Sequence, residues 1–356
     1  MKNLTRRSFI GVGAAATMAA ALAGCSSGGS SSASSASGSA SGSASASASA
    51  SAASSSAAAS AAPGDLRFVT GGESGTYFAV GTVIANHVTN NAGLKMTALS
   101  SEGSKDNVEK LDDQDAEFGF CQSDVMAYAY DGTNIFKGMP ITTFSTVAAL
   151  YEEQVQIVTC DASIKTVADL KGKRVSIGAA NSGVYFNAID ILGAYGITEA
   201  DITPSYQSFG DSANDLKDGK IDAAFIVAGA PTTAITELST SKTAYLVALD
   251  DQHVNDLLAA SPYYVKATIK AGTYDGQTED VTTVAVSAVI LASDEVKEDD
   301  VYKFTSDIFE NLKELEGSHA KFAEVDLDKA ASITSVPYHP GAAKYFQEKG
   351  KTVKAK

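Results

Sequence analysis

Short glycine-rich segments with hydroxyl side chains stand where strand-like stretches of the sequence give way to helix-like ones. The clearest is residues 70–77, in which three glycines and Ser74 precede Thr76 and Tyr77. Glycine lets a ligand approach the backbone closely, and the N–H groups at a helix start attract carboxylate or phosphate. No Lys follows at the spacing of a phosphate-binding P-loop, which excludes that motif. The segment therefore predicts a site for a small anion, with an ordinary strand-to-helix turn as the alternative.

Further turns of the same kind follow other strand-like stretches. Residues 100–104 and 121–124 bring hydroxyl or amide side chains to helix starts, and residues 180–185 do the same later in the chain. In a fourth turn Gly229 precedes Pro231, whose missing N–H suits the first position of a helix. Each turn alone has the composition of an ordinary helix N-cap. Several of them at strand ends predict a shared binding rim.

Strand-like and helix-like segments alternate along most of the chain, which predicts an α/β fold. Hydrophobic strands followed by glycine turns and helices are typical of mostly parallel sheets covered by helices on both faces. Residues 147–151 and 155–159 are predicted as two paired strands, and residues 231–239 and 299–315 as helices.

The length of the folded part predicts two lobes. Residues 64–356 are too many for one comfortable core and fit two units of roughly 100 to 200 residues each. Ligands of open α/β sheets bind at the carboxyl ends of strands, so two lobes that each offer a glycine turn would form a cleft. The predicted boundaries are 64–158 for the first part of lobe 1, 159–282 for lobe 2, and 283–356 for the return to lobe 1.

Charge is distributed unevenly along the chain. Of its 27 basic and 42 acidic residues, the first 63 positions hold only Lys2, Arg6 and Arg7 and no acid. The formal charge of −15 for the whole chain is therefore −18 for residues 64–356. This balance excludes nucleic acid as a partner, because phosphate neutralisation needs a basic face. Anionic lipid would also repel such a surface unless the protein is anchored.

The amino terminus has the features of an export signal. In residues 1–24 a twin arginine precedes an apolar run that is too short to span a bilayer, an arrangement that resembles a Tat signal. The run ends in Leu, Ala and Gly before Cys25, which resembles a bacterial lipoprotein cleavage box and implies that Cys25 carries lipid. Residues 25–63 consist almost entirely of Ser, Ala and Gly, as expected of a disordered tether. The sequence thus predicts an exported protein, lipid-anchored at the outer face of the cell membrane.

Six stretches of the folded part together resemble a known family, the TAXI group of solute receptors for tripartite, ion-driven TRAP transporters. The resemblance covers essentially residues 66–350, and its most specific motifs are the first glycine turn and the His339-Pro340-Gly341 sequence. The matching stretches are residues 71–77, 119–124, 167–175, 216–225, 269–274 and 338–342.

The resemblance implies a two-lobe periplasmic-binding-protein type II fold with a ligand in the cleft. Its two crossing segments are expected near residues 154–159 and 281–288. Family members are associated with small carboxylates such as glutamate, glutamine or 2-oxoglutarate, which they deliver to a membrane permease subunit. The ligand-binding set implied for this chain is Gly75, Thr76, Tyr77, Ser104, Asn107, Gln122, Ser123, Asn181, Ser182, Gly183 and Gly229.

The chain departs from the family pattern in two places. Glu73 stands where a small or uncharged residue is usual, and it could meet a ligand ammonium group or face water. Val184 and Tyr185 follow Gly183 where a Thr hydroxyl is common. Both departures bear on the identity of the ligand more than on the fold.

Arginine is scarce beyond the export signal. Only Arg67 and Arg174 remain, and both stand at the beginnings of strands, away from the strand ends that build the site. The bidentate Arg clamp that grips carboxylates in many receptors therefore has no candidate. Carboxylate binding is predicted to rely on backbone N–H groups and hydroxyls at helix starts.

The sequence predicts neither an enzyme nor a metal or cofactor site. Its histidines are scattered and no metal-binding motif is present; His339 is predicted to shape a turn. Cys121 and Cys160 both follow strands, and free thiols are favoured over a disulfide between them. The four histidines are His87, His253, His319 and His339.

Three functions remain in view at this point. The first is an extracytoplasmic receptor that delivers a small carboxylate or amino acid to a TRAP-type secondary transporter. The alternative is the substrate-binding lipoprotein of an ATP-driven importer, since type II folds serve both transport systems. The third is a surface lipoprotein or an enzyme on the same scaffold, without a role in transport.

Overall fold

The computed structural model describes residues 64–356. The predicted export signal, Cys25 and the predicted tether lie outside these residues. Between residues 64 and 356 there is no helix whose length and apolar character would let it cross a membrane.

One mixed sheet runs through the described part of the chain. Its strands are β1 (Leu66–Val69), β2 (Met96–Leu99), β3 (Phe118–Gln122), β4 (Phe144–Thr159), β5 (Arg174–Ser176), β6 (Thr203–Ser205), β7 (Ala223–Ala228), β8 (Tyr245–Leu246), β9 (Val265–Ile269) and β10 (Val281–Ser293). The order is β2-β1-β3-β10-β4-β7-β5-β6, with β8 on β4 and β9 on β10. Pairing is parallel at both ends, where β1 contacts β2 and β3, and β5 contacts β6 and β7. The middle is antiparallel, so the α/β fold is as predicted but the sheet is mixed.

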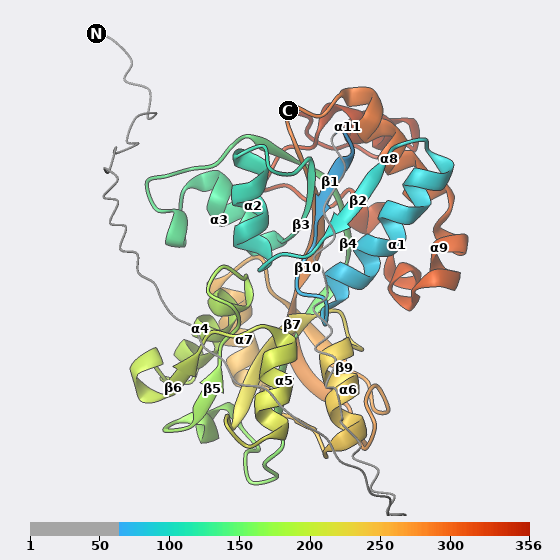
Figure 1. The fold of residues 1–356 in the computed structure, drawn as a ribbon. Helices are drawn as coiled ribbons and strands as arrows, with labels where there is room; N and C mark the ends of the chain where they lie inside the picture. Colours follow the sequence, from blue (N-terminus) through green and yellow to red (C-terminus); the bar gives the residue numbers. More distant parts are fainter. Residues whose placement is uncertain (1–63) are drawn as a thin grey trace, which may run out of the picture. The chain divides into compact units, whose positions relative to one another are not determined.

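Helices flank this sheet at both ends (Figure 1). The α-helices are α1 (Thr76–Asn91), α2 (Ser104–Asp112), α3 (Ser123–Asp131), α4 (Val184–Ala194), α5 (Phe209–Lys217), α6 (Thr233–Ser241), α7 (Asp251–Ala260), α8 (Glu298–Glu310), α9 (Leu312–Ser318), α10 (Leu327–Ala330) and α11 (Pro340–Glu348). The 3-10 helices are η1 (Asn134–Phe136), η2 (Val167–Leu170), η3 (Glu199–Asp201) and η4 (Ala320–Glu324).

Two helix predictions need correction. Pro231 is not the first residue of a helix, because α6 begins at Thr233 with Thr232 as its N-cap. The predicted helix over 299–315 is interrupted at Asn311, whose backbone leaves the helical region. The Asn311 amide donates to the carbonyl of Asp307 at 2.8 Å, and a side-chain bond of this kind competes with regular helix geometry.

The sequence did not predict several elements, among them α7, β8, β9 and α11. His339 does not simply shape a turn, because it stands at the N-cap of α11. Its Nδ1 atom accepts from the Gly341 N–H at 3.3 Å, and its Nε2 atom lies 3.1 Å from the carbonyl oxygen of Val296. Pro340 follows at the first helical position, where a missing N–H costs nothing.

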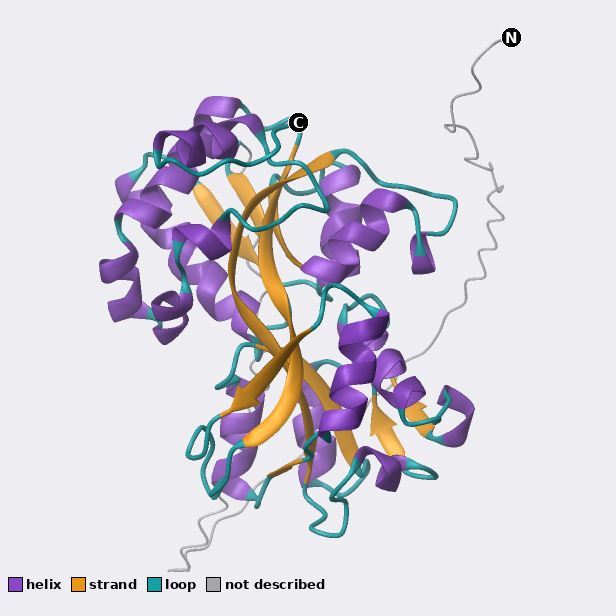
Figure 2. Ribbon diagram, turned by 180° about the vertical axis from the view of Figure 1, so that it is seen from behind, coloured by secondary structure: helices purple, strands orange, loops and turns teal. Residues whose placement is uncertain are grey.

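Two long strands, β4 and β10, cross from one half of the described structure to the other (Figure 2). The prediction of paired strands at 147–151 and 155–159 is wrong, because both segments belong to β4. The polar residues between them stay extended because 152–154 continue the ladder with 285–287 of β10. The crossing segments predicted near 154–159 and 281–288 lie within β4 and β10.

Two main hydrophobic cores lie on either side of these crossings. One contains buried residues from 68–151 and 288–346, and the other contains residues from 155–286 only. We refer to the parts built around them as the first lobe and the second lobe. The second core is formed by residues between the two crossings, and the first core by residues before the first crossing and after the second. The strands β4 and β10 therefore connect two separately packed lobes.

The contact between α11 and α8 in the first lobe depends on a glycine. A Cβ atom on Gly341 would lie 2.2 Å from the carbonyl oxygen of Glu298 and 2.8 Å from the amide nitrogen of Tyr302, both of which are backbone atoms. We expect Gly341→Ala to lower the free energy of unfolding by about 2 kcal/mol or more, because the helices must move apart. Chemical denaturation measures this. Gly317→Ala in α9 is the control, since its Cβ meets nothing within 4 Å; equal stability of the two variants would contradict the prediction.

Candidate functional site

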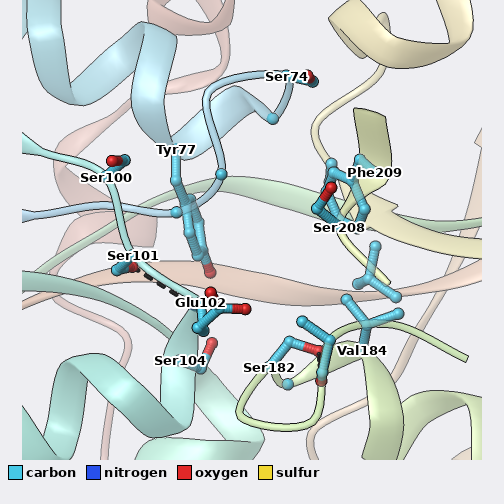
Figure 3. Close-up of a pocket in the computed structure, with 18 of the residues that line it drawn as sticks. Ser74, Tyr77, Ser100, Ser101, Glu102, Ser104, Ser182, Val184, Ser208 and Phe209 are labelled. Atoms are coloured by element: carbon cyan, nitrogen blue, oxygen red, sulfur yellow. Dashed lines mark hydrogen bonds between the residues drawn. The ribbon is translucent and has the colours of Figure 1, made fainter. Parts of the chain in front are cut away.

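A cavity of about 760 Å³ lies between the two lobes. Its walls include residues 71–77 and 100–104 of the first lobe and 182–184 and 207–211 of the second (Figure 3). Glu153 and Gln122 also line it. The glycine turns predicted from the sequence to form opposing rims therefore do face one cavity.

Four helices begin at this cavity: α1, α2, α4 and α5. No side chain caps the N-terminus of α1, α2 or α4. Ser208 caps α5, because its Oγ atom accepts from the Asp211 N–H at 3.1 Å. Uncapped helix starts carry positive potential and free backbone donors, so the walls suit an anionic group on a ligand.

The structure brings most of the predicted ligand-binding residues together. They occur at the three uncapped helix starts or at the end of β3. Their role in binding remains a prediction. The predicted residues that line the cavity are Gly75, Thr76, Tyr77, Ser104, Gln122, Ser182 and Gly183.

Two predicted residues are buried near the cavity but hold the first lobe together. The Asn107 amide donates to the carbonyls of Thr70 and Phe120, each at 2.7 Å. The Ser123 hydroxyl accepts from the backbone N–H of Ser287 at 3.1 Å, which connects α3 with β10. Both side chains support the strand ends from which the cavity walls arise.

The other two predicted residues outside the cavity wall make contacts between the lobes. The carbonyl of Asn181 accepts from the Asp106 N–H at 3.2 Å, at the first turn of α2. The carbonyl of Gly229 accepts from the Thr76 hydroxyl at 2.7 Å. The Thr76 hydroxyl is therefore used in closing the lobes rather than left free for a ligand.

A buried polar network also joins the lobes beside the cavity. The Gln122 amide donates to Asn187 Oδ1 at 2.6 Å, and the Asn187 amide donates to Asp124 Oδ2 at 2.9 Å. The same Asn187 amide lies 2.8 Å from the Tyr264 hydroxyl. Burial raises the pKa of Asp124 to about 6. These contacts describe a structure in which the lobes are closed on each other.

The buried part of the cavity wall around Glu153 and Tyr77, which we call the floor, holds a carboxyl group that the sequence analysis missed. Glu153 of β4 is 2 % exposed, lines the cavity, and its Oε1 atom has no hydrogen-bond partner. Burial raises its pKa to about 8, against the opposing effects of Lys321 and the Gly229 N–H. The signal that the sequence offers is an acidic pair, Glu152 and Glu153, between the two predicted strands 147–151 and 155–159.

Two tyrosine hydroxyls beside this carboxyl are also buried without a partner. Tyr77 stacks on Phe120 at 4.6 Å between ring centroids, and it extends from α1 into the cavity (Figure 3). Tyr151 lies two residues before Glu153 on the same face of β4. Burial raises the pKa of both tyrosines, so each keeps its proton.

The nearest buried cation is already paired. Lys321 of η4 is 3 % exposed, and its Nζ atom lies 2.5 Å from Glu324 Oε1. It also lies 5.8 Å from the centroid of the Tyr151 ring. Its aliphatic chain packs against Gly229, whose Cβ would fall 2.7 Å from Lys321 Cε.

Neither arginine of the described chain reaches the cavity. Arg67 pairs with Glu117 at 2.7 Å, and Arg174 pairs with Asp222 at 2.5 Å. The only base on the cavity wall within residues 64–356 is Lys110, which lies 2.6 Å from Asp106 Oδ2. An arginine clamp is thus absent from this site.

The second lobe contributes a wall that was not predicted. Gln207, Ser208 and Phe209 line the cavity, and α5 begins at Phe209. Ser208 followed by Asp211 three residues later has the spacing of an N-terminal capping box, and this signal could have located the helix start.

The cysteines and the acidic side chains of residues 64–356 form no other chemical site. Cys121 and Cys160 are both free thiols. No group of three His, Cys, Asp or Glu residues that could hold a metal ion occurs within this range.

Two lobes joined by crossing strands, with a cavity between them, define a periplasmic-binding-protein-like α/β fold, the fold of solute-binding proteins. The chain belongs to the NMT1-like family, whose model matches residues 68–350.

Solved structures share this fold at low sequence identity. A protein described as a periplasmic transporter has a TM-score of 0.50 and 14% identity, over 81% of this chain and 93% of that one. PhnD1 from Prochlorococcus marinus, in complex with methylphosphonate, has a TM-score of 0.50 and 10% identity, over 74% and 92%. The alkanesulfonate-binding protein SsuA from Xanthomonas axonopodis pv. citri, bound to MOPS, has a TM-score of 0.46 and 17% identity, over 82% and 92%. At these identities the likeness concerns the fold.

Proposed function

We propose that this protein is an extracytoplasmic solute-binding protein that closes its lobes around a small polar solute and passes it to a membrane importer. The observation that carries the proposal is the interlobe cavity, into which uncapped helix starts from both lobes open. Such helix starts suit an acidic group on the solute, and lobe closure removes it from water. The polar contacts between Thr76 and Gly229 and between Gln122 and Asn187 would hold the closed form.

A binding role fits the site better than catalysis. Among the described residues the cavity wall carries no histidine, and its one hydroxyl that donates to a carboxylate, Ser208 to Asp211 Oδ2 at 2.7 Å, belongs to the N-terminal cap of α5. Membership of the NMT1-like family and the fold shared with PhnD1 support the same choice.

Of the two importers considered, the comparisons support the ATP-driven one better than the TRAP-type secondary transporter. We therefore take the substrate-binding subunit of an ATP-driven importer as the first assignment and a TAXI receptor as the second. Reconstitution with the membrane partner distinguishes them, since solute uptake would depend on ATP in one case and on an ion gradient in the other.

The proposed location follows from the amino-terminal sequence. We propose that residues 1–24 direct export, that Cys25 carries lipid, and that residues 25–63 connect the binding domain to the outer face of the membrane. Replacement of Cys25 by Ala would then release the protein from the membrane fraction, and retention of the variant would contradict the anchor.

A solute screen tests the binding function. Small carboxylates, sulfonates, phosphonates and amino acids are added to the purified full-length chain, and thermal unfolding is followed. A ligand present at 100 times its Kd should stabilise the protein by about 2.7 kcal/mol and raise Tm accordingly. If no compound raises Tm and none gives heat in calorimetry, the proposed function is wrong.

A further inference from the structure

We infer that the solute carries a protonated amine, which Glu153 binds at the floor of the cavity. The inference rests on the proposed function and names the class of solute: a small zwitterion or cation with an ammonium group. It starts from a buried carboxyl group whose Oε1 atom has no hydrogen-bond partner among the described residues.

The balance of charge on the cavity wall favours a cationic group. Five carboxyl side chains line the cavity and Lys110 is the single base among the described lining residues. Lys110 is already paired with Asp106 at 2.6 Å. A ligand ammonium entering the cavity would therefore meet an excess of negative charge, and a ligand with acid groups alone would meet no free cation on the described wall. The lining carboxyl residues are Glu73, Glu102, Asp106, Glu153 and Asp211.

Glu153 differs from the other four because it is buried and its Oε1 atom has no hydrogen-bond partner among the described residues. Lys321 is the buried cation beside Glu153, and its ammonium group already contacts Glu324. Lys321 and the Gly229 N–H favour the ionised form of Glu153, but burial outweighs them, so an ionised Glu153 is only partly compensated inside the protein. A buried carboxylate without a counter-ion is costly, whereas one that pairs with an ammonium group and accepts its hydrogen bonds is stabilised.

The unpartnered tyrosine hydroxyls complete a site for an –NH₃⁺ group. An ammonium group has three donors and no acceptor. Glu153 Oε1 and the Tyr77 hydroxyl offer two acceptors at the cavity floor, and both lack partners in the protein. At the opposite walls, the starts of α1, α2 and α4 would receive an acidic group of the same solute.

Amine binding should be coupled to release of a proton. The groups that face Glu153 are Tyr151 of β4, Tyr77 of α1, and Lys321 and Glu324 of η4. The pKa of Glu153, raised to about 8 by burial, leaves it mostly protonated at pH 7 in the ligand-free protein. An arriving ammonium group favours the carboxylate, so the proton leaves Glu153 for the solvent.

The alternative to amine binding is that Glu153 stays protonated and donates a hydrogen bond to an acid group of the solute. The two uses predict opposite changes of solute affinity with pH. Amine binding tightens as pH rises toward 8 and releases a proton, whereas binding of an acid group by the protonated form weakens over that interval and releases none.

Matched pairs of solutes that differ by the amine test the inference. L-glutamate is compared with glutarate, taurine with ethanesulfonate, and aminomethylphosphonate with methylphosphonate, by calorimetry on the full-length chain. We expect the amine-bearing member of a pair that binds to have a Kd at least tenfold lower. Equal or tighter binding by the amine-free members overturns the inference while leaving the solute-binding function intact. Absence of binding by every solute overturns both.

Proton release on solute binding distinguishes a Glu153 that binds the amine from a Glu153 that only supports the structure. Titrations at pH 7 in buffers of different ionisation enthalpy should show release of about one proton per bound amine, decreasing toward none above about pH 9. Glu153→Gln should abolish this release and weaken amine binding at least tenfold. Glu152→Gln, on the opposite face of β4, is the matched control and should keep both properties. Unchanged proton release in Glu153→Gln would overturn the assignment.

Discussion

Glu153→Gln is expected to make the ligand-free protein more stable at neutral pH, although it removes a buried ionisable residue. The pKa of Glu153 is about 8 in the folded protein and 4.5 in the unfolded chain. The folded state binds the proton more tightly, so stability falls as pH rises from 4.5 to 8 and the loss is complete above that interval. Gln stays neutral in both states. The variant should gain about 3 kcal/mol at pH 7 and about 5 kcal/mol above pH 8, and nearly nothing at pH 4.

Denaturant unfolding of wild type and variant across pH 4 to 9 measures this difference. Glu152→Gln should follow the wild-type curve, because Glu152 is partly exposed and only contacts Lys329 at 3.6 Å. A variant that gains stability while it loses amine binding would identify Glu153 as a residue retained for its ligand. A variant less stable than wild type at pH 7 would instead mean that the carboxylate stabilises the fold.

Gly183→Ala is expected to weaken solute binding by preventing lobe closure. A Cβ atom at this position would lie 1.3 Å from Gln122 Oε1, across the cavity in the first lobe. Gln122 cannot turn aside without breaking its hydrogen bond to Asn187. If the closed form loses about 2 kcal/mol, which is typical of overpacking, the apparent Kd rises about 30-fold.

The readouts for Gly183→Ala are affinity by calorimetry and compaction on ligand binding by small-angle scattering. Gly193→Ala in α4 is the matched control, because its Cβ meets nothing within 4 Å and it lies in the same helix that Gly183 precedes. We expect normal affinity and normal compaction for the control. Wild-type affinity in Gly183→Ala would show that the closed arrangement of Gln122 and Gly183 is not needed for binding.

Local sequence signals predicted much of the fold. Glycine turns between apolar strands and amphipathic helices identified α1, α2 and α4 to within a few residues, because the signals for capping and periodicity lie inside one short segment. The prediction failed where long-range pairing overrides local composition. The polar residues 152–154 interrupt an apolar pattern, yet they stay extended since β10 pairs with them along β4.

In the candidate site, too, local sequence signals predicted one part and long-range contacts decided the rest. Seven of the predicted residues, from Gly75 to Gly183, line the cavity, because each stands at a helix start that the sequence makes recognisable. Thr76 was predicted as a ligand group, but its hydroxyl donates to Gly229 of the other lobe. A contact over 153 positions of sequence has no local signal.

By itself the sequence determined that this is an α/β chain with glycine turns at helix starts, and that its two arginines after residue 63 stand at the beginnings of strands. Those properties depend on residues that are neighbours in the chain. The tertiary structure decided which group occupies the cavity floor, because Glu153, Tyr77 and Lys321 come from three distant elements. Lys321 contacts Glu324 there, burial raises the pKa of Glu153, and its Oε1 atom is left without a hydrogen-bond partner among the described residues. The sequence-based expectation of a small carboxylate or amino acid is thereby narrowed to a solute that carries an amine.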